Sequence, residues 1–320
     1  MKIYVPKEFM GQRIDCAVSS ITKELSRSQF QRYVKNGNVS LDGIVIRDSS
    51  HKIHQPCLID VIEEAEEFTA SPEDIPVDIV FEDEFIVVIN KAAGMVCHPA
   101  PGHRSGTLVN AMQYILGNSL SDISGPLRLG IVHRLDKDTS GLMIVAKSNR
   151  AHMEFAKLFA EGKGTQIRRK YICFAYGVVS PKEGVVDTFI CRHPKHRQKF
   201  MVNEDEQGKR AITQYTIEKT RYFTGTKAIS KIRCELMTGR THQIRVHMQY
   251  IKMPLVGDQV YGILKKDPIF PDYITEFTRQ ALHSFELSFI HPFTQDNMIF
   301  TAALPTDMQM LEEAICDPEI

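Results

Sequence analysis

The sequence lacks the cysteine pattern of a metal site or a disulfide scaffold. Its seven cysteines are scattered without a C-x-x-C pair, which argues against a zinc site and against a disulfide framework. No window approaches the roughly 18 unbroken apolar residues of a membrane helix. The first fifteen residues have no long apolar region and no small-residue cleavage pattern. We therefore expect no bound metal, no secretory signal, no membrane span and a cytoplasmic location.

Net charge is absent as well, because 39 basic residues balance 39 acidic ones. The overall charge therefore indicates no partner. The segment from Lys163 to Phe200 differs, since it holds nine Lys and Arg residues against two acidic residues, a local excess of seven. A patch of this kind suits the phosphate backbone of a nucleic acid. A solvated loop is the alternative interpretation.

The length of 320 residues suits roughly two domains. The stretch from Glu63 to Pro76 is acidic, holds two prolines and has no apolar periodicity, which is typical of a linker. We expect a small N-terminal domain at residues 1–64, a linker at 65–76 and a larger domain at 77–320. The sequence contains no internal repeat and no low-complexity tract.

The N-terminal domain begins with two helical patterns and a hairpin pattern. One apolar stripe predicts an amphipathic first helix: Ile14, Ala17, Val18, Ile21 and Leu25. Ser26 is expected to cap a second helix that ends at Gly37 and has a basic outer face. That face carries Arg27, Gln31, Arg32 and Lys35. The turn pair Asp42-Gly43 predicts a β-hairpin. A generic helical cap packed on the larger domain would have the same pattern.

Strand patterns dominate the larger domain, with helical patterns between them. The main predicted strands cover 77–83, 84–91, 130–133, 142–148, 168–179, 211–219 and 227–239. Predicted helices cover 107–116, 150–162 and 241–251. This mixture predicts an α+β fold with a mixed, largely antiparallel sheet.

A short charged run, His133 to Asp138, lies between two of these apolar strands. Asp, Ser and Gly are ordinary turn formers, so a plain loop is one interpretation. Arg134 and Lys137 lie beside the carboxylates of Asp136 and Asp138, and neighbouring cations favour the ionised carboxylate that a nucleophile or base needs. The run therefore also fits a reactive aspartate.

A phosphatase is a competing chemical interpretation of the same run. Residues 136–139 fit the D-x-D-x-T box of haloacid-dehalogenase-type phosphatases. That box should follow an unbroken apolar strand, whereas His133 and Arg134 interrupt the strand here. The stretch that begins at Gly257 also lacks the second acidic residue that a magnesium site requires.

A second motif lies between Leu236 and Met248. Thr241 can cap a helix on which His242 and Arg245 share one face. Arg245 lies between two apolar residues, and a buried arginine normally has a carboxylate partner. Alternatively Arg240 and Arg245 are surface charges. His242 and His247 are five residues apart, which does not suit a metal-binding pair.

Several long motifs, in this order, resemble the RluA/RluD family of RNA pseudouridine synthases. They are HRLDKDTSG at 133–141, TGRTHQIRVHM followed by P..GD..YG at 238–262, and RQALH at 279–283. The resemblance covers essentially the whole chain, and the run from Leu25 to Gly43 resembles the S4 RNA-binding domain. One departure is Lys91-Ala92-Ala93-Gly94, where the family usually has Lys-Pro-x-Gly. Losing this proline loosens a loop but removes no reactive group.

This resemblance implies an isomerase that detaches uracil from its ribose and rejoins it through C5, with no cofactor. It implies that Asp136 is the essential carboxylate, that Tyr171 stacks on the target base, and that Arg245 pairs with Asp136. Asp136 either adds to the sugar or base or removes a ribose proton, and both possibilities stay open. A base stacked in RNA must flip out to reach such a site, and Arg134 is the candidate that fills the gap.

The expected partner is RNA, specifically large-subunit ribosomal RNA or a precursor particle, because family members with the S4 module act there. The further RNA-binding candidates are Arg27, Arg32, Lys35, Arg168, Arg169, Arg240 and His242. The resemblance also implies a monomer. The alternative from another functional class is a noncatalytic ribosome-assembly factor on the same scaffold, which has no physical need to keep Asp136, Tyr171 and Arg245.

Overall fold

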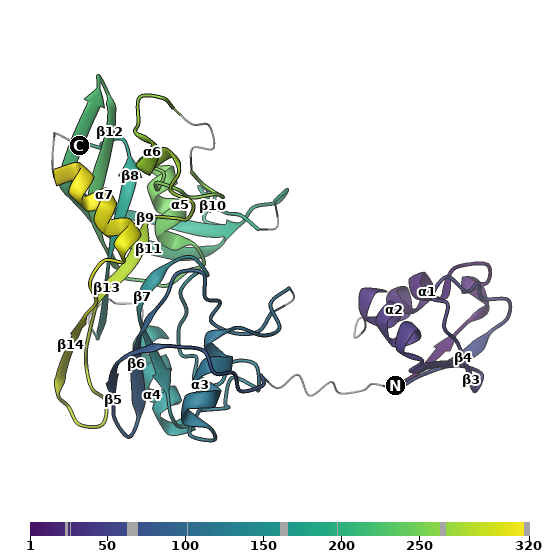
Figure 1. Ribbon diagram of the computed structural model, residues 1–320. Helices are drawn as coiled ribbons and strands as arrows, with labels where there is room; N and C mark the ends of the chain where they lie inside the picture. Colours follow the sequence, from purple (N-terminus) through teal and green to yellow (C-terminus); the bar gives the residue numbers. More distant parts are fainter. Residues whose placement is uncertain are drawn as a thin grey trace. The chain divides into compact units, whose positions relative to one another are not determined.

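The chain divides into two compact units, Met1–Phe68 and Thr69–Ile320, in a computed structural model (Figure 1). The structure describes residues 1–22, 25, 27–62, 70–100, 102–160, 166–196, 198–262 and 267–316. The expected cap Ser26 lies outside these residues, as do Lys163 and Arg197 of the basic segment. Residues 70–76, at the start of the second unit, hydrogen-bond within it, and Glu73 N donates to Asn110 O at 3.0 Å.

The first unit packs two helices on one face of a four-stranded antiparallel sheet. Its elements are β1 (Lys2–Val5), η1 (Lys7–Phe9), α1 (Ile14–Ile21), α2 (Arg27–Asn36), β2 (Val39–Leu41), β3 (Ile44–Val45) and β4 (Cys57–Val61), with strand order β1-β4-β2-β3. Phe30 and Val34 of α2 are buried against Ile59 of β4. Asp42 and Gly43 both have positive φ, 48° and 84°, as the predicted two-residue hairpin turn requires. The first helix ends at Ile21, four residues earlier than its apolar stripe suggested.

The second unit is built on one ten-stranded sheet, which confirms the predicted mixed, largely antiparallel α+β class. Its strands are β5 (Asp78–Glu82), β6 (Ile86–Lys91), β7 (Ser140–Ala146), β8 (Ile167–Tyr176), β9 (Glu183–Arg192), β10 (Phe200–Asn203), β11 (Lys209–Thr224), β12 (Lys227–Leu236), β13 (Leu282–Ile290) and β14 (Asn297–Thr301). The order is β10-β9-β11-β12-β8-β13-β7-β6-β5, and β14 pairs with β13. β13 runs parallel to β7, whereas its pairing with β8 is antiparallel.

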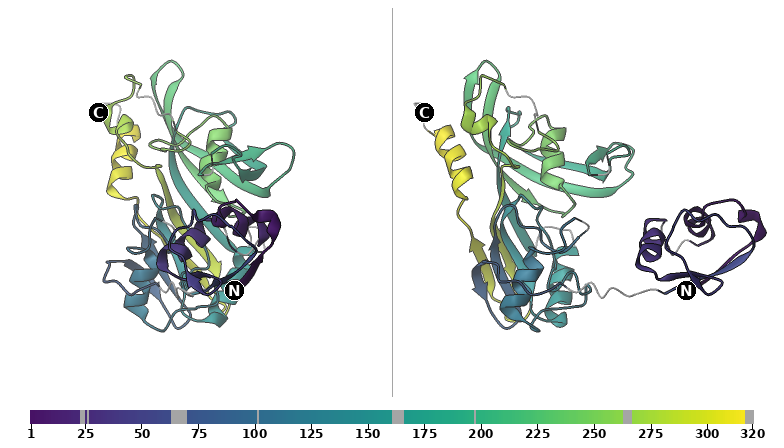
Figure 2. Two further views of the ribbon diagram at one scale, coloured as in Figure 1. Left: turned by 90° about the vertical axis from the view of Figure 1, so that its right-hand side faces the viewer. Right: turned by 45° about the vertical axis from the view of Figure 1, so that its right-hand side comes forward.

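Helices cover both faces of this sheet. They are α3 (Leu108–Leu116), α4 (Asn149–Ala160), α5 (Gln243–Tyr250), α6 (Asp272–Thr275) and α7 (Thr306–Cys316). The side chains of β8 alternate between the two faces, as a strand requires. Tyr171 and Cys173 join the core under α3 and α5, whereas Ile172 and Phe174 join the core under α6 and α7. Figures 1 and 2 show these helices on the two sides of the sheet. The site described below lies on the α5 side.

The predicted strand at 130–133 is wrong. Ile131 forms only a single bridge to Val145, and the chain around it is a turn. Gly130 has φ of 68°, and a Cβ there would lie 2.6 Å from Val145 Cγ1. His133 Nε2 accepts a hydrogen bond from Ile144 N at 2.9 Å, so a side chain takes the backbone N–H that a neighbouring strand would use. The imidazole ring of His133, and not strand-to-strand pairing of the backbone, therefore connects the segment before Asp136 to the middle of β7.

Candidate active site

Asp136 lies in the loop that leads into β7, and the loop is tied to the chain before β13. Thr139 N donates to Asp136 O at 3.1 Å, which closes a turn around the aspartate. Arg279 Nη1 donates to Asp138 O at 3.0 Å, and Gln280 Nε2 donates to Thr139 Oγ1 at 3.1 Å. Two motifs 141 residues apart in the sequence are thus joined, and the backbone around Asp136 is fixed.

Lys91, at the end of β6, ties a second loop to the same turn. Its Nζ donates to the carbonyl oxygens of Ala92, Met95 and Lys137 at 2.7, 2.9 and 3.0 Å. Gly94 N also donates to Lys137 O, at 3.0 Å. Burial lowers the pKa of Lys91 to about 8. From the sequence, this stretch was interpreted only as a loop that lacks the family's proline, and the role of its lysine was missed.

Arg245, on α5, connects two carboxylates. Its Nη1 donates to Asp136 Oδ2 at 2.9 Å, while Nε and Nη2 donate to Asp258 Oδ2 and Oδ1 at 2.7 and 2.9 Å. Burial opposes the charge on the guanidinium, but Asp258 and Asp136 together raise the pKa of Arg245. The guanidinium is therefore held by Asp258 with its remaining nitrogen directed at Asp136.

Asp258 is a site residue that the sequence analysis missed. It is buried, and its Oδ1 also accepts from Val260 N and Tyr261 N, each at 2.9 Å. Its signal was visible in the family motif P..GD..YG, but the residue was weighed only as a magnesium ligand. Its actual partner is a cation of the protein.

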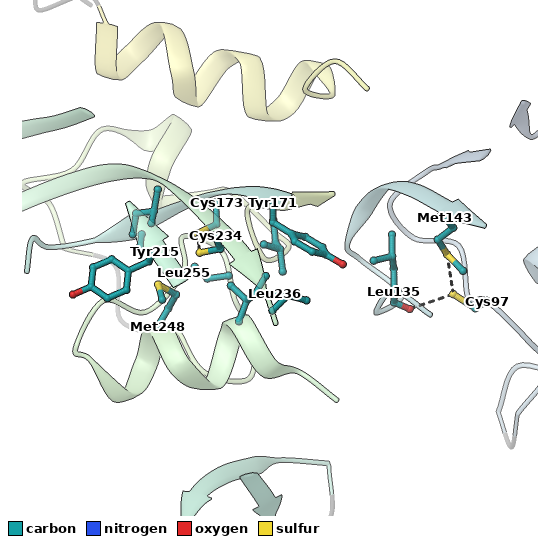
Figure 3. Packing of buried hydrophobic residues seen from close by; sticks show 14 of the residues in the cluster. Cys97, Leu135, Met143, Tyr171, Cys173, Tyr215, Cys234, Leu236, Met248 and Leu255 are labelled. Carbon is teal, nitrogen blue, oxygen red and sulfur yellow. Dashed lines mark hydrogen bonds between the residues drawn. The ribbon is translucent and has the colours of Figure 1, made fainter. Parts of the chain in front are cut away.

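Tyr171 faces the same space from β8. Figure 3 shows its hydroxyl directed away from the buried Cys173 and Cys234 and toward the loop that carries Leu135. The ring is buried, and burial raises the pKa of Tyr171, so the phenol is neutral near pH 7. A neutral aromatic ring at a cavity wall suits stacking on a base.

A cavity of about 380 Å³ brings seven of the predicted site residues together: Arg134, Asp136, Arg169, Tyr171, Arg240, His242 and Arg245. Its volume falls within the range of small-ligand pockets, about 300–1,000 Å³. Arg134 and Arg240 are exposed, whereas Arg169 and Arg245 are buried. The arrangement offers one carboxylate, the aromatic rings of Tyr171 and Phe159 and an excess of cations to a ligand.

His242 takes the place expected for Thr241 at the start of α5, so the predicted Thr241 cap is wrong. His242 is the N-terminal boundary residue, with φ of 57°, and its side chain does not cap the helix. This left-handed conformation directs the ring to Tyr261, whose hydroxyl lies 2.8 Å from His242 Nδ1. His242 Nε2 lies 3.9 Å from Asp136 Oδ1. Burial lowers the pKa of His242, so the ring is neutral at pH 7.

The remaining RNA-binding candidates lie elsewhere. Arg168 points to the other face of β8, where its Nε donates to Glu235 Oε1 at 2.8 Å. In the first unit, Arg27 Nε donates to the buried Asp15 at 3.1 Å, so part of its charge is used within the fold. Arg32 and Lys35 are exposed on the same helix.

Among the described residues, no group of three or more His, Cys, Asp or Glu side chains is arranged to hold a metal ion. His247, in particular, contacts Thr213 and Thr188 through its two ring nitrogens at 2.8 and 3.1 Å. None of the helices in the described part of the chain is long and apolar enough to cross a membrane.

Comparison with known proteins identifies the family. Residues 85–250 match the RNA pseudouridylate synthase family, and these bounds include Asp136, Tyr171 and Arg245. The chain belongs to this family. An RNA pseudouridylate synthase is an isomerase, and its family match leaves no place for the phosphatase interpretation of residues 136–139.

Relatives of this synthase extend over nearly its whole length. The ribosomal large subunit pseudouridine synthase D of Zymomonas mobilis is 43% identical over 97% of this chain and 96% of its own. The protein of the same name from Pseudomonas aeruginosa is 42% identical over 96% and 93%. The solved human RNA pseudouridylate synthase domain containing 4 has a TM-score of 0.56 and 20% identity, over 75% of this chain and 93% of its own. That last likeness shows a shared fold.

Proposed function

We propose that this synthase converts uridines of large-subunit ribosomal RNA to pseudouridine, with Asp136 as the essential carboxylate. The observation that carries this proposal is the 2.9 Å contact of Arg245 with Asp136 in a cavity that Tyr171 also lines. The names of the relatives, which specify the large ribosomal subunit, support the choice of substrate.

In the proposed reaction the N1–C1′ bond of uridine breaks and a C5–C1′ bond forms. The proton on C5 leaves and N1 gains one, so the composition is unchanged and no oxidant or reductant is needed. Asp136 either adds to the sugar or base or removes a ribose proton. Arg245 keeps the carboxylate aimed, because Asp258 fixes the guanidinium from behind. Tyr171 stacks on the base.

The target uridine flips out of its stack to enter the cavity, and Arg134 braces the position it leaves. Exposure of Arg134 at the cavity supports this role. The first unit is proposed to be an S4-like RNA-binding module, whose α2 presents Arg32 and Lys35 to solvent. Because such contacts release counterions, RNA affinity should fall steeply with salt. An affinity unchanged between low and high salt would contradict this part of the account.

The proposed domain organisation is a separate module at residues 1–64, a linker at 65–76 and a catalytic domain at 77–320. The monomeric state and the cytoplasmic location are likewise predictions.

The test compares unmodified transcripts of large-subunit and small-subunit ribosomal RNA, incubated with the full chain and then digested to nucleosides. Chromatography measures their pseudouridine content. We expect pseudouridine in the large-subunit transcript, little in the small-subunit transcript and none with Asp136→Asn. Equal modification of both transcripts would contradict the proposed choice of substrate. Tight RNA binding without any pseudouridine would favour the noncatalytic assembly factor.

A further inference from the structure

Three consecutive basic residues on β8 differ in their surroundings. Arg168 and Lys170 point to the α7 side of the sheet, and each has a carboxylate partner on a neighbouring strand. Arg168 Nε lies 2.8 Å from Glu235, and Lys170 Nζ lies 2.7 Å from Glu286. Arg169, between them, points to the opposite face and has no ion pair with any described residue.

Arg169 is nevertheless deeply buried, with 7% of its surface exposed, and its Nε has no hydrogen-bond partner. Its guanidinium carbon lies 5.5 Å from the centre of the Phe159 ring. A buried arginine without a carboxylate is unusual, because the lost hydration is only partly offset by an aromatic ring. Arg169 is thus a buried cation without a carboxylate partner among the described residues.

The side chain of Arg169 lies in the cavity of the candidate active site. Arg169 and Tyr171 are two residues apart on one strand, so they share a face at a spacing of roughly 6–7 Å. Both line the cavity that holds Asp136. The carboxylate of Asp136 is bonded to Arg245, so it does not serve as the partner of Arg169. The exposed Arg134 and Arg240 add further positive charge to the same cavity.

We infer that Arg169 binds a backbone phosphate adjacent to the flipped uridine. The inference rests on the proposed function, in which Tyr171 stacks on the base. A phosphate is joined to that base through one ribose, so it can lie one strand repeat away, beside Arg169. The planar guanidinium matches two phosphate oxygens and supplies charge-assisted hydrogen bonds. The phosphate then provides the anion that the protein does not.

Gly239 leaves room for this guanidinium. A Cβ built at Gly239 would lie 2.8 Å from Arg169 Nη1, closer than real Cβ atoms approach other atoms. Gly239→Ala therefore displaces the flexible end of Arg169 without removing its charge. Together with Arg169→Met, it gives two independent ways to disturb the site.

The first arm of the test needs no catalysis. Thermal unfolding of the full chain is followed in millimolar inorganic phosphate, with sodium chloride keeping the ionic strength constant. We expect phosphate to raise the unfolding midpoint of the wild type and of Arg168→Met, and to have much less effect on Arg169→Met and Gly239→Ala. Arg168→Met is the matched control, because it removes the neighbouring charge from the other face. No shift in the wild type, or equal shifts in all four proteins, would overturn the inference; equal shifts are what a general surface effect of phosphate produces.

The second arm measures uridine isomerisation. Arg169→Met is expected to lower kcat/KM by about 10- to 100-fold, and Arg169→Lys by less. If Arg169 only supports the fold, Arg169→Met lowers the midpoint without phosphate and the phosphate response persists, which would overturn the inference. An inactive wild type that still responds to phosphate through Arg169 would contradict the proposed function and leave the phosphate site standing.

Discussion

Arg245 and Asp258 form a buried, two-point ion pair, with Nε and Nη2 of the arginine 2.7 and 2.9 Å from the two carboxylate oxygens. This pair leaves Nη1 free to reach Asp136 at 2.9 Å. The orientation of the candidate catalytic carboxylate therefore depends on a second aspartate that lies behind the arginine.

Asp258→Asn is expected to reduce both stability and activity. The substitution leaves the buried Arg245 with one carboxylate in place of two, and breaking a buried pair costs about 3–5 kcal/mol. Urea denaturation measures the stability, and initial isomerisation rates measure kcat, which should fall at least tenfold as Arg245 shifts.

Asp187→Asn is the matched control for that experiment. Asp187 makes the same two-point contact with Arg210, at 3.0 and 2.6 Å, but on the exposed surface of β9 and β11. Exposed pairs contribute about 0–1 kcal/mol, so this variant should keep its stability and kcat. Similar losses in both variants would mean that burial of the Arg245 pair does not matter.

Lys91→Met should weaken the Asp136 loop. The substitution removes a donor from three partly buried carbonyl oxygens, and of these Lys137 O keeps a second donor, Gly94 N. An unsatisfied buried polar group costs about 1–3 kcal/mol. Lys147→Met is the control, because Lys147 Nζ likewise joins separate segments, through Glu82 and Asp83 O at 2.7 Å, away from the cavity. Both variants should unfold at lower urea, but only Lys91→Met should lower kcat. An unchanged kcat in Lys91→Met would show that its three contacts do not position Asp136.

Stability should fall as the pH drops below about 6.5, and His247 accounts for part of the fall. Burial lowers the pKa of His247 to about 4 in the folded protein. Between about pH 6.5 and 4 the unfolded chain binds a proton at this residue and the folded chain does not, so acid favours unfolding. The expected loss from His247 at pH 5 is about 2 kcal/mol. His247→Gln retains hydrogen-bonding capacity toward Thr213, and its free energy of unfolding should decline less steeply with falling pH than that of the wild type. Parallel curves of unfolding free energy against pH would show that His247 does not contribute to the decline.

The sequence predicted the parts of this site that follow from local patterns. His242 and Arg245 were predicted to share one side of a helix, and both lie near Asp136, although His242 precedes α5 as its left-handed boundary residue. Tyr171, by contrast, was expected at the site only through the family resemblance, and the structure places its ring in a wall of the core.

The parts that depend on distant segments were not predictable in the same way. The pairing of Arg245 with Asp258 joins a helix to a later loop, and the Lys91 contacts join β6 to a loop 46 residues away. No local periodicity specifies which strands become neighbours, so the placement of β13 between β7 and β8 was not foreseen. The left-handed conformation of His242 replaced the expected Thr241 cap for a related reason, since Tyr261 and Asp136 determine where the ring lies.

The most direct test of the account is tritium release from RNA carrying 5-tritiated uridine, with the wild type and Asp136→Asn compared at equal RNA binding. Isomerisation through C5 must free that hydrogen to water. The account predicts release by the wild type and none by Asp136→Asn. Release by both proteins would show that Asp136 is not the essential carboxylate. No release by either protein, with RNA still bound, would contradict the proposed reaction on this RNA.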